Sequence, residues 1–136
     1  MPKIFGLNSL GVIAASIAFY FVGFLWYGIL FPDLWMQGSG YVAEQFEGQS
    51  PVWMVGGFLI TIMQVIGIGV VLRWRGAADI GGAVKAIALL WLLLALPFCH
   101  YHYLYGPIHD AGLLMVDASH FLVGWVISAV ILSLLK

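Results

Sequence analysis

Charged side chains are scarce in this chain. They account for 8% of its 136 residues, whereas a soluble globular domain carries about 25%. This scarcity excludes a water-soluble domain. The hydrophobic content of 63% also excludes a disordered chain, because disordered chains are poor in apolar and aromatic residues. What remains is an integral membrane protein whose surroundings are the lipid bilayer.

Cysteine is rare, and basic patches and catalytic motifs are lacking. Cys99 is the single cysteine, so it forms no intramolecular disulfide and does not indicate a redox compartment. With a formal net charge of −1 and no basic patch, the chain is not expected to bind nucleic acid. No nucleophile elbow surrounds Ser119, and no glycine loop could cradle a phosphate. We therefore predict no catalytic residue and favour a protein that is not an enzyme.

Long apolar stretches are present instead. About 20 helical residues cross a hydrocarbon core of roughly 30 Å, and no segment shows the alternation of a transmembrane strand. The sequence thus predicts an all-α fold, a four-helix bundle that forms a single transmembrane domain over residues 1–136. The predicted spans are 8–31, 52–72, 81–104 and 111–135.

The basic residues predict the orientation of these spans. Lys3 precedes the first span, Arg73, Arg75 and Lys85 flank the turn between the second and third, and Lys136 follows the fourth. With four crossings all five fall on one side. Because cytoplasmic loops carry the excess of Lys and Arg, we expect both termini in the cytoplasm and a multi-pass protein of the inner membrane.

The loop over residues 32–51 holds no Lys or Arg and is too polar to span. A short interfacial helix on the outer surface is predicted there, with its aromatic side chains in the headgroup layer. Further aromatic residues map to the same level and are typical of an aromatic belt. The belt residues are Trp26, Tyr27, Trp35, Trp53, Tyr101, Tyr103 and Tyr105.

Small and polar residues within the spans predict helix contacts. Gly11 with Ala15 and Ala14 with Ala18 form small-xxx-small pairs, and the second span has four glycines, which fits contacts within one protomer or in a homo-oligomer. Three polar residues are assigned to helix packing rather than transport, because an amide or hydroxyl at such depth should hydrogen-bond to protein. They are Gln64, Thr61 and Asn8.

A proline precedes two histidines in the third span. Pro97 removes one backbone donor, so a kink is expected there. If the following segment stays helical, His100 and His102 point to nearly opposite faces, and if it unwinds they share one side.

All four histidines fall between positions 100 and 120, near the predicted outer face. Asp117 and His120 are three residues apart on the fourth span, so their side chains are neighbours. An ionisable residue within a span usually faces a cavity, a partner or the bundle interior. The predicted metal or proton site comprises Asp117, His120, His100, His102, His109 and Asp110.

Three interpretations of the Asp117–His120 pair stay open. In the first, Asp117 accepts a hydrogen bond from His120 and the pair is structural. In the second, the two side chains bind a divalent metal ion such as zinc. In the third, they form a proton relay or ion path. A haem held by His102 and His120 is a weaker variant, since only the presence of histidine supports it.

Two segments resemble the Domain of Unknown Function 1761 family. The first is Trp26-Tyr27 followed by Leu30-Phe31 and Trp35-Met36, with Asn8 at the start of the span. The second is Val116-Asp117-Ala118, followed by an aromatic-rich helix through Gly124 to Ile131-Leu132. Pro32 lies later than the proline of that pattern, and His120 stands where an aromatic residue is expected.

This resemblance covers nearly the whole chain and emphasises Asp117. It implies a small bacterial multi-span membrane protein without an assigned activity. Two hypotheses for the function follow: a transport protein that handles an ion, a metal or protons, or a non-enzymatic accessory or scaffold subunit of a membrane complex with a purely structural Asp117–His120 pair. The second would require a membrane protein partner.

Overall fold

Four helical segments, each long and apolar enough to cross a membrane, make up most of the computed structural model, which describes residues 2–136. The protein is therefore a multi-pass membrane protein of the predicted all-α class. The spans are α1 (Ser9–Phe24) with the π-helical η1 (Leu25–Leu30), α3 (Val52–Arg75), α4 (Ile80–Leu90) with the π-helical η3 (Trp91–Ala95) and α5 (Leu96–Tyr105), and α6 (Ala111–Leu134).

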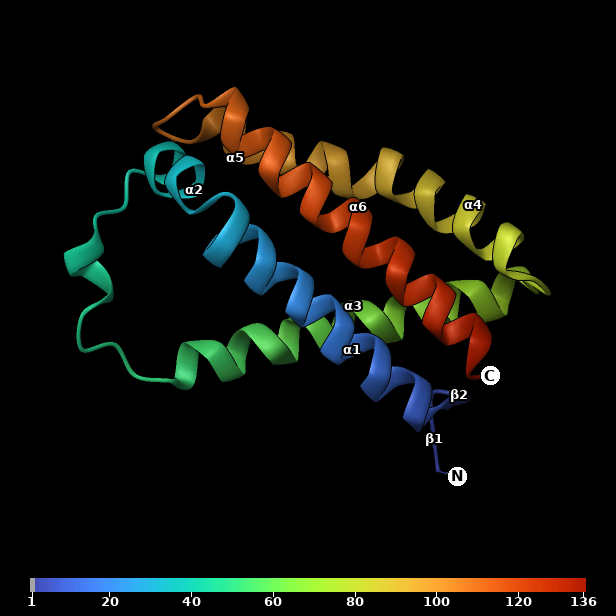
Figure 1. Ribbon diagram of the computed structural model, residues 1–136. Coiled ribbons are helices and arrows are strands. Elements are labelled where there is room, and N and C mark those ends of the chain that lie inside the picture. The colour runs from blue at the N-terminus through green and yellow to red at the C-terminus, as the bar shows by residue number, and fades with distance from the viewer. Residues whose placement is uncertain (1) are drawn as a thin grey trace.

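Both termini and the turn between α3 and α4 lie at one end of the bundle (Figure 1). The side chains of Lys3, Arg73, Arg75 and Lys136 belong to these segments, and we call this the basic end. It also carries a short hairpin of β1 (Lys3–Ile4) and β2 (Leu7–Asn8), which was not predicted because two-residue strands leave no periodic pattern.

The other end of the bundle holds the connection between the first two spans. It contains α2 (Pro32–Ser39) and the 3-10 helix η2 (Ala43–Phe46), where a short helix was expected. Pro32 is the first residue of α2, a position where its missing N–H costs no hydrogen bond. In Figure 1, α2 lies beside the end of α5 and the start of α6.

The core is formed by close approach of α1 and α6. Ala15 and Ala129 are fully buried, and Phe19 packs directly over Gly124. Small residues permit this proximity, which matters in lipid because helix association there depends on van der Waals packing. The α1–α6 contact places the second half of α1 against the first half of α6.

The glycines of α3 differ in what they face. Gly57 lies next to Tyr20 of α1, and Gly69 packs against Leu7 of the hairpin. At Gly56 and Gly67, no atom of residues 2–136 lies within 4 Å of the position that a Cβ would take. Gly57 and Gly69 thus make contacts within the protomer. The formation of a homo-oligomer stays a prediction.

Pro97 distorts the third span without ending it. Because proline has no N–H and its ring clashes with the preceding turn, the regular hydrogen-bond ladder is interrupted, and the N–H of Leu96 reaches the carbonyl of Trp91 in the π turn. Beyond Pro97 the chain stays helical to Tyr105. His100 and His102 therefore lie roughly 200° apart around the helix axis.

The polar residues assigned to helix packing make different contacts. Gln64 Oε1 accepts a hydrogen bond of 2.9 Å from Trp125 Nε1, which joins α3 to α6. The hydroxyl of Thr61 donates within its own helix to the carbonyl of Gly57 at 3.0 Å. Asn8 caps α1 by accepting from the N–H of Leu10 at 3.0 Å.

The bond between Gln64 and Trp125 gives a first testable expectation. Gln64→Leu should lower the free energy of unfolding by about 0.6 kcal/mol, the average for hydrogen bonds between membrane helices. Trp125→Phe should cost more, because packing is lost as well. Thermal unfolding of the two single variants and the double variant in detergent measures the coupling. Strictly additive effects would show that the bond contributes nothing.

Candidate functional site

Asp117 is held by a tyrosine of the first span. The hydroxyl of Tyr27, in η1, donates to Asp117 Oδ1 at 2.5 Å. The predicted hydrogen bond between His120 and Asp117 is not formed, so the first interpretation of this pair is wrong about the partner. The imidazole of His120 instead lies among aromatic rings, and Tyr27 is the residue that reaches Asp117. The other carboxylate oxygen, Oδ2, accepts no hydrogen bond within residues 2–136.

Two tryptophans hold the next residues of α6. Trp26 Nε1 donates to Ser119 Oγ at 2.9 Å, and Trp91 Nε1, at the start of η3, donates to the carbonyl of Ala118 at 2.8 Å. The polar groups of Trp26 and Tyr27 thus point toward α6, a contact that the prediction of an aromatic belt did not include. The two residues of η1 and Trp91 fix the first half of α6 in position and rotation.

His120 lies among aromatic rings. Its ring centroid is 5.1 Å from that of Tyr27, 5.5 Å from Phe19 and 4.9 Å from Phe121. A Cβ at Gly23 would come within 3.2 Å of His120 Nε2, so the glycine makes room for the imidazole. His120 Nδ1 is buried and has no hydrogen-bond partner in the described chain.

Within residues 2–136 the remaining residues of the predicted site make no hydrogen bond to Asp117 or His120. His100 donates from Nδ1 to the carbonyl of Leu96 at 2.7 Å, and His109 to that of Tyr103 at 2.5 Å. Asp110 caps α6 by accepting from the N–H of Leu113 at 2.7 Å, and His102 is exposed.

The positions of these side chains do not support a metal site with three or more protein ligands among residues 2–136. Within residues 2–136 no group of three or more His, Cys, Asp or Glu side chains could hold a metal ion. Of the six residues predicted for the site, all within the described chain, Asp117 and His120 line a common cavity and the other four do not.

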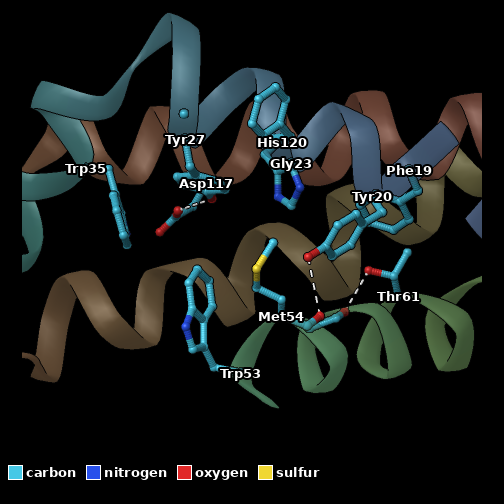
Figure 2. A pocket seen from close by; sticks show the side chains of 13 residues that line it. Phe19, Tyr20, Gly23, Tyr27, Trp35, Trp53, Met54, Thr61, Asp117 and His120 are labelled. Atoms are coloured by element: carbon cyan, nitrogen blue, oxygen red, sulfur yellow. Dashed lines mark hydrogen bonds between the residues drawn. The ribbon is translucent and has the colours of Figure 1, made fainter. Parts of the chain in front are cut away.

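A cavity of about 480 Å³ lies beside Asp117, between α1, α3 and α6. Figure 2 shows Asp117 and Tyr27 on one side of it and Trp53 and Met54, from the start of α3, on the other. The hydroxyl of Tyr20 donates to the carbonyl of Met54 at 3.3 Å and ties α1 to α3 next to the cavity. The lining residues are Phe19, Tyr20, Gly23, Phe24, Tyr27, Gly28, Trp35, Trp53, Met54, Gly57, Thr61, Asp117 and His120.

Part of the cavity wall is formed by exposed side chains of α1 and α3. Phe24, Trp53 and Met54, which line it, are 57%, 58% and 47% exposed. All three belong to helical segments that are long and apolar enough to cross a membrane.

Sequence reasoning missed the aromatic walls of this cavity. Trp35 and Trp53 were interpreted as membrane anchors, since their spacing along the chain gives no sign that they approach Asp117. The one available signal was the density of aromatic residues on both sides of the loop over 32–51.

The sequence profile of DUF1761, described as a protein of unknown function, matches residues 10–133. This chain belongs to the DUF1761 family. No curated protein and no solved structure matches it. The two segments that resemble the family in sequence, around Trp26-Tyr27 and Val116-Asp117-Ala118, are the segments that hydrogen-bond to each other.

In this DUF1761 protein the cavity combines three chemical properties. Its walls are mostly aromatic and apolar, Asp117 is the single acidic residue among the lining residues, and no Lys or Arg is among them. A carboxylate in apolar surroundings is costly unless a proton, a donor or a cation compensates it. The hydroxyl of Tyr27 compensates one oxygen, and the other is left for a group that enters the cavity.

Proposed function

We propose that this protein binds small organic cations in the cavity beside Asp117 and serves in their transport. The observation that carries the proposal is the pairing of a single carboxylate with aromatic walls in a cavity without a protein cation. This proposal refines the ion-handling hypothesis and involves no chemical step. It takes the protein to lie in the inner membrane with the basic end in the cytoplasm, which places the cavity in the outer half.

Electrostatics support a cationic ligand. Asp117 Oδ1 is already bonded to Tyr27, and Oδ2 accepts no bond from the described chain, so the carboxylate offers one acceptor to the cavity. Apolar walls exclude water and strengthen the attraction between this acceptor and a positive charge. An anionic ligand would be repelled by the same carboxylate.

The aromatic walls support an organic rather than a metallic cation. The faces of Trp, Tyr and Phe attract ammonium groups through their quadrupole, most strongly for Trp. In Figure 2, Trp35 lies on the same side of the cavity as Asp117, and Trp53 lies across the cavity from them. The volume of about 480 Å³ suits a small molecule, since ligand pockets measure roughly 300–1,000 Å³.

Benzyltrimethylammonium tests this proposal directly. Isothermal titration calorimetry of the purified full chain should detect binding, and Asp117→Asn should raise the Kd at least about tenfold, equivalent to 1.4 kcal/mol. The asparagine can still accept the hydrogen bond of Tyr27, so the fold should be kept. Trp53→Leu should raise the Kd about threefold, in line with one exposed cation–π contact.

Asp33→Asn is the matched control for this experiment. Asp33 is exposed in α2 and does not line the cavity, so its replacement removes one negative charge elsewhere and should leave the Kd unchanged. An unchanged Kd in folded Asp117→Asn would contradict the proposal. The remaining role of Asp117 would then be to hold Tyr27, as the scaffold hypothesis requires.

A further inference from the structure

We infer that the basic end carries a binding site for the phosphate of an anionic phospholipid. A second cavity of about 380 Å³ lies there, between the hairpin, the end of α3 and the end of α6. Lys3, Arg73 and Lys136 line it, and no Asp or Glu is among its lining residues. The inference is independent of the proposed function, because it uses a different cavity and different residues.

The hairpin brings two of these cations together. Phe5 and Gly6 form its turn, with φ of 51° and 80°, as in the tight turns whose twist matches a two-stranded hairpin. A Cβ at Gly6 would overlap the guanidinium of Arg73, so the glycine lets this side chain cross the turn. Arg73 donates to the carbonyl of Phe5 at 3.1 Å, on the hairpin that also carries Lys3.

The charges of this cavity are left largely uncompensated. Lys136 Nζ donates to the carbonyls of Ala77 and Ala78 at 3.1 and 3.3 Å, so both Lys136 and Arg73 are held by neutral backbone oxygens. The nearby carboxylate of Asp79 accepts from the N–H of Gly82 at the start of α4. Several donors of the three cations therefore stay available for an anion.

The surroundings indicate a lipid rather than a soluble anion. Leu7, Leu72 and Leu132 share the cavity with the three cations, so a phosphate group and the start of an acyl chain could both be accommodated. The site lies where the spans end, at the level where headgroups meet protein. Basic pockets between helices at the cytoplasmic side are typical sites for anionic headgroups, and Arg binds phosphate with two parallel hydrogen bonds.

Native mass spectrometry of the full chain tests the inference. The protein is released from micelles that contain equal amounts of phosphatidylglycerol and phosphatidylcholine, and the retained lipids are counted. We expect phosphatidylglycerol to be preferred, and Lys3→Gln and Arg73→Gln each to reduce that preference about fivefold, as for one basic contact. Lys3 donates no side-chain hydrogen bond to any of residues 2–136, so its variant tests the charge without disturbing the contacts described.

Arg75→Gln is the matched control. Arg75 ends the same helix but does not line the cavity, so the preference should be kept. Equal retention of the two lipids by the unmodified chain would overturn the inference, as would an equal loss in Arg75→Gln, because a diffuse positive field would then suffice. If an excess of inorganic phosphate displaced phosphatidylglycerol, the inference would be overturned, because the cavity would then bind a soluble anion rather than a phospholipid.

Discussion

Replacing Gly124 with alanine is expected to lower the free energy of unfolding by about 2 kcal/mol, within the range for overpacked cores. A Cβ at this position would overlap the ring of Phe19, which is 1% exposed and has no space to withdraw. The α1 and α6 backbones would have to separate. Because packing drives helix association in lipid, that separation weakens the main contact of the bundle.

Gly67→Ala is the control for this variant. In the part of the chain that the structure describes, no atom lies within 4 Å of a Cβ at Gly67. Alanine should therefore leave stability unchanged or raise it by up to about 1 kcal/mol through its better helix propensity. Thermal unfolding and size-exclusion profiles in detergent compare the two variants. If Gly124→Ala were as stable as Gly67→Ala, the close approach of α1 and α6 would be refuted.

Removing the hydroxyl of Tyr27 is the second change with a large expected effect. Tyr27→Phe should lower the free energy of unfolding by about 2 kcal/mol, the scale for a hydrogen bond to a charged group. The phenylalanine keeps the ring contact with His120, while Asp117 Oδ1 loses its donor. An unpaired carboxylate oxygen within a span then carries the full desolvation cost.

A double-mutant cycle isolates this bond. In the Asp117→Leu background there is no carboxylate to satisfy, so Tyr27→Phe should have almost no effect. Tyr101→Phe serves as the control, because Tyr101 is exposed and its hydroxyl makes no hydrogen bond within residues 2–136. Equal costs of Tyr27→Phe in both backgrounds would show that the hydroxyl and the carboxylate do not interact.

Several features of this protein could be predicted from local sequence patterns alone. The four spans could be predicted, because the bilayer requires every crossing segment to be apolar over its own length. The caps of α1 and α6 by Asn8 and Asp110 are likewise local, since each side chain bonds to an N–H two or three residues away. Asp117 could be singled out as a candidate for the same reason, as a carboxylate within an apolar run.

The partners of Asp117 and His120 could not be predicted in this way. The spacing of three residues places the two side chains on one face of α6, but it does not say which helix faces them. Tyr27 lies 90 residues away in sequence and reaches Asp117 from a π turn. A π turn shifts the rotation of the residues that follow, which periodicity analysis with a regular helix does not anticipate.

For the histidines, closeness in sequence did not predict closeness in the structure. Their closeness in sequence favoured a common cluster, yet of the four, all within residues 2–136, His120 alone lines the cavity. His100 and His109 bond to backbone carbonyls of their own neighbourhood. Because α5 stays helical beyond Pro97, its residues are distributed around the axis instead of being gathered on one side.

The amino-acid sequence by itself determined that this chain has four helical segments long and apolar enough to cross a membrane, and it predicted one common side for their basic residues. Those properties depend on each segment alone, because solvation by lipid acts on every span separately. Only the tertiary structure decided that Tyr27 holds Asp117, that Trp53 of α3 faces them across a cavity, and that the hairpin meets Arg73. Such contacts depend on how helices rotate and cross, and that is set by the packing of small residues between them.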